Sequence, residues 1–578
     1  MMEQGHTIDL EGLEKRFPDL EKPAVASLTT QLRSGAVTGL VGPDGAGKTT
    51  LLRMLAGLLR PSAGTLRVAG LDPLADDRRL HAILGYMPQK FGLYEDLTVM
   101  ENLTLYADLR GVTGEVRRAT FQRLLEFTDL TRFTGRLAGK LSGGMKQKLG
   151  LACTLLGEPQ VLLLDEPGVG VDPISRRELW RMVHELANDG MLILWSTSYL
   201  DEAEQCREVL LMNEGQLLFS GAPQELTRRM AGRSILLAAP SGSHRALLQQ
   251  AICLPTVTDG VIQGKYLRLI LKPDADHQQV LQDLQIPDVE LREAEPRFED
   301  AFIDLLGGGP NSKSALAAIM PTVSGDGAET VIEAQNLTKK FGDFAATDHV
   351  DFQVKRGEIF GLLGPNGAGK STTFKMMCGL LVPSDGKALV LGMDLKTSSG
   401  KARQHLGYMA QKFSLYGNLT VAQNLKFFSG VYGLSGKKQR QKMAEMSAAF
   451  NFGPIINQAP DALPLGFKQR LALACALMHE PDILFLDEPT SGVDPLTRRE
   501  FWLHINGMVD KGVTVMVTTH FMDEAEYCDR IGLVYRGKII AAGTPDDLKQ
   551  QVASEQNPNP SMEQAFIELV QGYDREEQ

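Results

Sequence analysis

The chain of 578 residues is longer than one globular core normally supports, and at about 150 residues per domain it predicts three or four domains. Its 43% hydrophobic and 23% charged residues are typical of a globular protein, and no stretch approaches the roughly 18 continuous apolar residues of a membrane-spanning helix. Because the net charge is −11 and the first ten residues lack a signal-peptide pattern, we expect a cytoplasmic chain that binds no nucleic acid.

Two glycine-rich stretches, residues 42–49 and 364–371, share the pattern G-x-x-x-x-G-K-[ST]. Each follows a short apolar run and precedes a helix-like segment. In that context the glycines expose backbone N–H groups to phosphate, and the lysine adds a full positive charge. The sequence therefore predicts two P-loops, with Lys48 and Lys370 as their lysines.

The two P-loops belong to a longer internal repeat. Their lysines are 322 positions apart, and the same offset relates Gln89 to Gln411. A constant offset over this distance indicates duplicated domains with the same order of elements. We expect these domains at residues 1–230 and 330–550.

In each half an apolar run ends in Asp-Glu-Pro, 117 positions after the P-loop lysine. The acids are Asp165 and Glu166 in the first half and Asp487 and Glu488 in the second. A buried parallel strand that ends in acids is typical of the ligand-binding edge of an open α/β sheet. The first acid can hold Mg²⁺ through water and the second can orient an attacking water, as phosphoryl transfer requires.

The first half carries 58 additional residues, because the repeat offset falls to 264 between Phe302 and Phe566. The additional residues predict, in order, a strand, a helix, two strands, a helix and a strand, at 234–239, 244–252, 256–262, 266–271, 277–284 and 289–294. This βαββαβ order favours a small α+β, ferredoxin-like module. We favour a scaffolding role for it, with binding of a regulator or ligand as the alternative.

Three further segments complete the predicted organisation. Residues 231–306 hold the small module and an amphipathic docking helix, and residues 551–578 form a C-terminal tail with a similar helix. Residues 307–329, rich in glycine, are expected to be a flexible linker.

Several short motifs resemble those of ATP-binding-cassette (ABC) ATPases. Residues 141–145, Leu-Ser-Gly-Gly-Met, resemble the family's signature motif; Gln89 and Gln411 stand where its Q-loop glutamine stands, and Asp172 and Asp494 match its D-loop. Nearly the whole chain resembles a tandem ABC ATPase. The resemblance implies an α/β fold with two P-loop NTPase domains, each with an inserted helical subdomain.

A narrower resemblance concerns residues 93–103 and 199–204, which are similar to ATPases of type-two ABC exporters, including the drug-resistance class. The general resemblance to ABC ATPases implies ATP and Mg²⁺ as ligands, and Glu488, His520, Gln411 and Lys370 as catalytic residues. The implied nucleotide contacts are Phe17, Gly42, Asp44, Gly45, Gly47, Lys48, Thr49, Thr50, Ser142, Gly143, Gly144, Phe341, Gly364, Asn366, Gly367, Gly369, Lys370, Ser371 and Thr372. The implied Mg²⁺ contacts are Thr49, Gln89, Asp165, Ser371, Gln411 and Asp487.

The chain departs from the family pattern at two places. ABC ATPases work as a head-to-tail sandwich, with each ATP between the P-loop of one domain and the signature of the other. The second signature reads Pro464 and Leu465, which lack the hydroxyl donor and the open backbone that a γ-phosphate needs. Ser198 stands in the first half where His520, the switch histidine, stands in the second.

Both losses fall on the composite site built on Lys48. We therefore hypothesise one hydrolytic site, built on Lys370, and one degenerate site that binds ATP but hydrolyses it poorly. The degenerate site comprises Gln89, Glu166, Ser198, Pro464 and Leu465 in addition to its P-loop.

The resemblance implies an ATP-hydrolysing subunit that powers drug or xenobiotic export through two separate integral membrane permease subunits. Such a subunit would be a peripheral protein at the cytoplasmic face of the bacterial inner membrane. The segments after Gln89 and Gln411 are its expected docking surfaces, although Phe91 and Phe413 there suit a domain core equally well.

Two other functions remain as alternatives. One is the tandem ATPase of a nutrient importer. The other is a soluble ATPase that binds ribosomes. Proteins of the latter kind usually have a long, charged, helical linker and two intact signatures, whereas this linker is short and rich in glycine.

Overall fold

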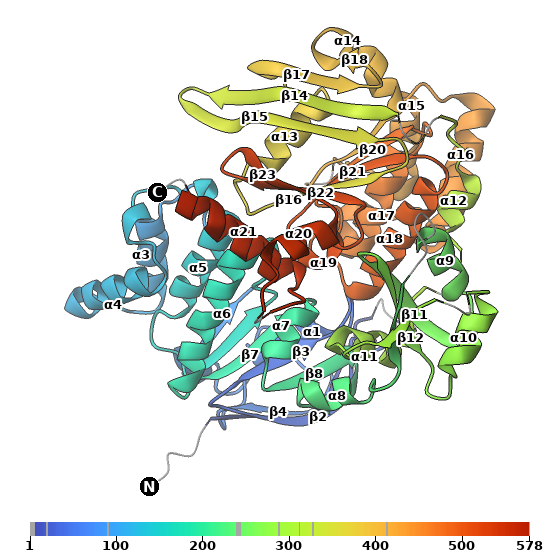
Figure 1. Ribbon diagram of the computed structural model, residues 1–578. Helices are drawn as coiled ribbons and strands as arrows, with labels where there is room; N and C mark the ends of the chain where they lie inside the picture. The colour runs from blue at the N-terminus through green and yellow to red at the C-terminus, as the bar shows by residue number, and fades with distance from the viewer. Residues whose placement is uncertain are drawn as a thin grey trace. The chain divides into compact units, whose positions relative to one another are not determined.

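The computed structural model describes residues 6–18, 21–89, 92–238, 244–286, 289–310, 313–325, 327, 329–411, 414–555 and 557–576 (Figure 1). The chain divides into two compact units. Unit 1 comprises residues 1–231, 296–306 and 492–495, and unit 2 comprises residues 232–295, 307–491 and 496–578.

Unit 1 is built around a six-stranded sheet whose strands are parallel except for the edge strand β9. In sheet order the strands are β5 (Leu84–Met87), β6 (Val161–Asp165), β7 (Leu192–Thr197), β3 (Val37–Val41), β8 (Glu208–Asn213) and β9 (Gln216–Gly221). Every residue of β3, β6 and β7 is buried, which explains why these strands are continuous apolar runs in the sequence.

A smaller antiparallel sheet and a set of helices complete unit 1. The sheet contains β2 (Val25–Arg33), β1 (Thr7–Lys15) and β4 (Ala63–Val68) in that order. The helices are α1 (Lys48–Leu55), α2 (Asp77–Ile83), α3 (Val99–Leu109), α4 (Gly114–Phe127), α5 (Gly143–Thr154), α6 (Pro173–Asn188), α7 (Leu200–Gln205), α8 (Pro223–Arg228) and α11 (Phe298–Leu305). Helices α3 to α5 lie between β5 and β6 in the chain and form the helical subdomain.

Unit 2 repeats this architecture. Its six-stranded sheet contains β19 (Leu406–Met409), β20 (Ile483–Asp487), β21 (Thr514–Thr519), β16 (Ile359–Leu363), β22 (Arg530–Tyr535) and β23 (Lys538–Gly543), in an order equivalent to that of unit 1. Its antiparallel sheet contains β15 (Phe344–Lys355), β14 (Thr330–Phe341), β17 (Asp385–Val390) and β18 (Met393–Asp394). The helices are α13 (Lys370–Met377), α14 (Leu395–Ala402), α15 (Val421–Val431), α16 (Gly436–Ala449), α17 (Leu465–Ala476), α18 (Pro495–Val509), α19 (Met522–Ala525), α20 (Pro545–Val552) and α21 (Met562–Glu576). The expected α/β fold with two P-loop domains is confirmed.

The additional residues of the first half form a small module that belongs to unit 2. Its elements are β10 (Ser234–Ala238), α9 (His244–Ala251), β11 (Val257–Gln263), β12 (Tyr266–Leu271), α10 (His277–Asp283) and β13 (Leu291–Glu293). The four strands form one antiparallel sheet in the order β11-β12-β10-β13. The apolar core of this module is continuous with the core around α17 and α18 of the second P-loop domain (Figure 1).

The two predicted amphipathic helices, α11 and α21, bury their apolar faces against neighbouring elements. Helix α11 buries Phe298 and Phe302 and packs on α7 and α8 within unit 1, and α21 buries Phe566 against α19, α20 and β23 within unit 2. The segment 307–329, expected to be a flexible linker, contains the short helix α12 (Ala315–Ile319), whose Leu316 is fully buried. This part of the linker is therefore packed.

Candidate functional site

Each P-loop lies between a central strand and a helix, β3 and α1 in the first domain and β16 and α13 in the second. Gly47 and Gly369 cap the two helices with φ of 103° and 107°, a left-handed conformation that favours glycine. A Cβ atom there would lie 2.2 Å from the carbonyl oxygen of Ala24 and 2.3 Å from that of Ala346. Only glycine therefore allows the loop to approach the neighbouring backbone and present its N–H groups.

The P-loop lysines are buried and held by their own loops. Lys48 Nζ donates to the Gly42 carbonyl at 2.7 Å, and Lys370 Nζ donates to the Gly364 carbonyl at 2.6 Å. The ammonium group thus lies beside the helix N-terminus, whose N–H groups carry partial positive charge. This combination suits the phosphates of a nucleotide.

A hydroxyl group and a carboxylate meet next to each P-loop. Thr49 Oγ1 donates to Asp165 Oδ1 at 3.2 Å, and Ser371 Oγ donates to Asp487 Oδ1 at 3.5 Å. Hydroxyl and carboxylate oxygens are the hard ligands that Mg²⁺ prefers beside phosphate. The residues present therefore fit an Mg²⁺-bound nucleotide.

The glutamates that follow these strands share an unusual backbone conformation. Glu166 has φ of 51° and Glu488 has φ of 48°, a left-handed region that residues other than glycine seldom adopt. Such conformations persist only where the surrounding structure holds them, and they concentrate at functional sites. Gln89 Nε2 donates to Glu166 Oε2 at 2.6 Å, and Gln411 Nε2 donates to Glu488 Oε2 at 2.8 Å.

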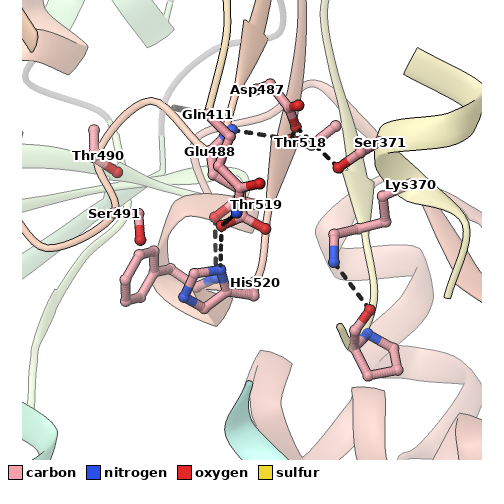
Figure 2. Close-up of polar contacts among 12 residues, drawn as sticks. Lys370, Ser371, Gln411, Asp487, Glu488, Thr490, Ser491, Thr518, Thr519 and His520 are labelled. Carbon is pink, nitrogen blue, oxygen red and sulfur yellow. Dashed lines mark hydrogen bonds and ion pairs between the residues drawn. The ribbon is translucent and has the colours of Figure 1, made fainter. Parts of the chain in front are cut away.

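The two glutamates differ in their remaining partner. Figure 2 shows Gln411 and His520 at Glu488, and His520 Nδ1 lies 3.2 Å from Glu488 Oε2. At the equivalent position of the first domain the Oγ of Ser198 is buried and has no hydrogen-bond partner in the part of the chain that the structure describes. Glu166 lies 3.3 Å from Lys48 Nζ, and the charge of Lys370 likewise acts on Glu488. Among the described residues, only the second glutamate therefore contacts a histidine.

Three carboxylates of the two sites have shifted pKa values. Burial works to raise the pKa of Glu488, but the nearby charges of His520 and Lys370 outweigh it and hold this pKa at about 2. Burial, with the charge of Glu166 next to it, raises the pKa of Asp165 to about 6. Burial also raises the pKa of Asp487. Glu488 is thus ionised at every physiological pH, whereas each aspartate is costly to ionise without a cation.

Asp165→Asn is expected to stabilise the nucleotide-free protein at pH 7.5. Because the folded-state pKa of about 6 lies above the ordinary value of 3.8, the cost of ionising Asp165 grows as pH rises between these values and reaches at most about 3 kcal/mol. The thermal unfolding midpoint of the variant should exceed that of the wild type at pH 7.5. At pH 5 the difference between the two midpoints should be about half as large.

The same variant should lose the additional stabilisation that Mg²⁺ gives to the ATP complex, since a neutral amide holds the cation poorly. Asp96→Asn, at an exposed carboxylate, is the matched control. It should leave the unfolding midpoints of the nucleotide-free protein and of the ATP complex unchanged. An unfolding midpoint of Asp165→Asn at or below that of the wild type at pH 7.5 would contradict this account.

The two signature positions differ in how they begin their helices. Ser142 Oγ accepts a hydrogen bond from Met145 N at 3.3 Å and so caps α5. Pro464 occupies the same position before α17 and offers no side-chain cap. In unit 1 Asp172 caps α6 through Ser175 N at 3.1 Å.

The aromatic residues expected to stack on adenine are not part of the core. The side chain of Phe341 is 54% exposed and that of Phe17 is partly exposed, with Lys339 and Lys15 beside their rings. Both rings are accessible to a flat ligand. Phe91 and Phe413 lie outside the described residues.

Sequence reasoning missed one residue of the second site. Thr518 Oγ1 donates to Asp487 Oδ1 at 2.6 Å and accepts from Glu488 N at 3.0 Å, so it fixes both acids (Figure 2). The available signal was its place at the end of β21, next in the sheet to the strand that carries the acids.

No helix formed by the described residues combines the length and the apolar character needed to cross a membrane.

Comparisons with known proteins agree with two P-loop domains in one chain. The family model described as "ABC transporter" matches residues 25–169 and 347–491. The chain is 74% identical to the "Probable multidrug ABC transporter ATP-binding protein YbhF" of Escherichia coli (strain K12), over 98% of both chains.

Two further comparisons cover a single domain. The chain is 37% identical to the "Daunorubicin/doxorubicin resistance ATP-binding protein DrrA" of Streptomyces peucetius, over 39% of this chain and 68% of that protein. A solved structure titled "Structure of ATP binding subunit of ABC transporter" aligns at 29% identity with a TM-score of 0.39, over 42% of this chain and all of that one.

Proposed function

Because the chain belongs to the ABC transporter family and is a tandem ATPase with one P-loop domain in each half, we propose that it powers the export of drug-like compounds through separate membrane permease subunits. The names of the relatives YbhF and DrrA, which refer to probable multidrug transport and to daunorubicin/doxorubicin resistance, support the proposed cargo class. The proposal places the chain as a peripheral protein at the cytoplasmic face of a bacterial inner membrane, with two permease subunits as partners.

ATP hydrolysis is assigned to the site of the second P-loop domain. Lys370 and the N-terminus of α13 hold the β- and γ-phosphates, and Phe341 stacks on the adenine. Glu488, ionised and held by Gln411, orients the water that attacks the γ-phosphate. Mg²⁺ held at Ser371, Asp487 and Gln411 would neutralise charge between the two phosphates.

The contact between His520 and Glu488 is the observation that carries this assignment. The histidine can hold the glutamate in place and reach a γ-phosphate beside it, whereas the buried hydroxyl of Ser198 makes no such contact among the described residues. We assign slow hydrolysis to the site built on Lys48 for this reason.

The two domains are proposed to pair with each other within the chain, as in the head-to-tail sandwich of the family. In that arrangement the ATP on Lys48 meets Pro464 and Leu465, and the ATP on Lys370 meets Ser142 and Gly143. The first site then lacks both the histidine and the signature hydroxyl, while the second lacks neither. ATP binding closes the pair and hydrolysis reopens it, which shifts the population of the attached permease.

The helical subdomains are the proposed docking surfaces for the permease. Leu109 in the first domain is 74% exposed, and Val431 at the equivalent position of the second is 63% exposed. Tyr94 and Tyr416, also equivalent to each other, add exposed aromatic area. A hollow of about 530 Å³ lined by Met100, Phe121 and Leu125 among others lies beside α4. Exposed apolar residues at equivalent places of a repeat fit a short amphipathic helix from each permease subunit.

The double substitution Leu109→Ser and Val431→Ser is expected to reduce the amount of permease that co-purifies with the chain from detergent-solubilised membranes by about tenfold, since each serine removes apolar contact area. Mass spectrometry identifies and quantifies the partners.

The matched control is Leu58→Ser with Leu380→Ser, another equivalent pair of exposed leucines outside the helical subdomains. It should retain wild-type amounts of permease. Recovery of ribosomal proteins in place of membrane proteins would overturn the proposed function, and a periplasmic binding protein in the complex would indicate import.

The small module of residues 232–295 is proposed to be ferredoxin-like. The order of its elements and the strand order β11-β12-β10-β13, antiparallel throughout, support this classification. The proposed domain boundaries at 230, 306, 329 and 550 remain those predicted from the sequence.

A further inference from the structure

The small module buries a carboxylate against the second P-loop domain. Asp259 on β11 is 2% exposed at its side chain, and its Oδ2 accepts from Arg499 Nε on α18 at 3.1 Å. Arg499 is 7% exposed. A buried carboxylate and a buried guanidinium stabilise each other, because an unpaired charge in this environment is strongly unfavourable.

The surroundings of Asp259 leave little freedom to its side chain. Gly309 N donates to the Thr258 carbonyl at 3.0 Å, and a Cβ atom on Gly309 would lie 2.0 Å from Asp259 Oδ1. The cavity between the module and α18 has a volume of about 30 Å³, room for about one water. The contact between the module and α18 is therefore closely packed.

Arg499 and its neighbour Arg498 also hold the segment that follows the switch histidine. Arg499 Nη1 donates to the Tyr527 hydroxyl at 2.6 Å. The guanidinium of Arg498 lies 4.9 Å from the Phe521 ring centre and 3.8 Å from Glu524 Oε1. Residues 521–527 come directly after His520, so α18 contacts the module on one side and this segment on the other.

Glu524 continues the contacts to the catalytic residues. Its buried carboxylate accepts from Thr519 Oγ1 at 2.6 Å and from Thr490 Oγ1. Thr519 precedes His520, and Thr490 stands two positions after Glu488 (Figure 2). Polar contacts therefore join the module to Tyr527, and the neighbouring arginine of α18 lies beside the carboxylate that holds Thr519 and Thr490.

The first domain differs along this route. At the same offset Gln205 stands in place of Tyr527, and Gly168 stands in place of Thr490. Glu202, equivalent to Glu524, has an Oε1 atom without a hydrogen-bond partner among the described residues. The first domain keeps the bond from Thr197 Oγ1 to Glu202 at 2.6 Å, but it lacks the tyrosine and the threonine at these positions.

We propose that Asp259 and Arg499 are positioning residues for ATP hydrolysis, through which the small module orients His520 and Glu488. The inference rests on the proposed function, because it presupposes hydrolysis at the site built on Lys370. The module thus contributes to turnover without touching the nucleotide.

The test measures steady-state ATP hydrolysis by the full chain co-purified with its membrane partners. Asp259→Asn and Tyr527→Phe should each lower kcat by about tenfold, because a small displacement of a catalytic group is costly. The KM for ATP should stay within about twofold, since the P-loop is untouched. Glu290→Gln, at an exposed carboxylate paired with Arg292 in the same module, should change neither quantity.

Tyr527→Phe keeps the ring that packs on Trp502 and so decides the result if Asp259→Asn does not fold. The two substitutions combined should lower kcat no further than the larger single effect, since both interrupt one route. A wild-type kcat in Tyr527→Phe, or fully additive losses, would overturn the inference.

Glu488→Gln, measured in parallel, separates the two proposals. If Glu488→Gln is inactive while Asp259→Asn and Tyr527→Phe keep the wild-type kcat, only the positioning role is overturned. If Glu488→Gln remains active, the assigned hydrolytic site is wrong.

Discussion

Glu488→Gln is expected to reduce steady-state ATP hydrolysis by about 100-fold or more, because a positioned general base contributes about that factor. Glutamine keeps the size of the side chain but lacks the negative charge that orients the attacking water. Glu166→Gln is expected to retain at least about half of the wild-type rate, because Ser198 stands where the second site has His520 and makes no hydrogen bond among the described residues. The measurement is ATP turnover by the full chain assembled with its membrane partners.

ATP affinity serves as the control for this comparison. Neither glutamate belongs to a P-loop, so both variants should bind ATP about as tightly as the wild type does. A variant that loses both turnover and ATP binding reports damage to the fold rather than loss of a base.

The second large effect is the repair of the degenerate site. In the Glu488→Gln background, the three substitutions Ser198→His, Pro464→Ser and Leu465→Gly are expected to restore ATP hydrolysis to within about tenfold of the wild type. The serine can cap α17 as Ser142 caps α5, and the imidazole can reach Glu166 as His520 reaches Glu488. ATP turnover by the purified complex measures the repair.

Ser198→His alone is the control for the repair. It returns the histidine but leaves proline and leucine at the signature position, so it should restore little hydrolysis. If the triple variant folds and binds ATP but stays at the level of Glu488→Gln, the assignment of both losses to one composite site is wrong.

Much of the fold could be predicted because its signals are local. The P-loops, the buried strands that end in Asp165 and Asp487, and the elements of the small module all lie within a few residues of their predicted positions. Each rests on a run of apolar residues, a glycine pattern or an alternation that a short window of sequence contains. The repeat strengthened the predictions of the P-loops and of the strands that end in acids, because these patterns occurred twice.

The contacts that complete the second site could not be predicted in this way. Thr518 supports both acids because β20 and β21 are neighbours in the sheet, which no local pattern reveals. The burial of Asp259 against Arg499 joins residues that are far apart in the chain. The left-handed conformation of Glu488 likewise depends on the packing around it.

The packing of the small module and the linker also depends on tertiary structure. A glycine-rich composition predicts flexibility for residues 307–329, yet Leu316 is buried and Ser314 Oγ lies 2.9 Å from His504 Nδ1. For the predicted adenine-stacking residues the difference has the opposite sign, because a residue type typical of the core is exposed. An isolated phenylalanine suggests a core position, but the exposure of Phe341 agrees with ligand stacking.

The central claim is that one P-loop site hydrolyses ATP rapidly and the other only slowly. The ratio of the residual ATPase rates of Glu166→Gln and Glu488→Gln, measured side by side in the assembled complex, tests it most directly. We expect a ratio of about 50 or more, since only Glu488 has the contacts of a general base. A ratio close to one, with equal losses in both variants, would contradict the account.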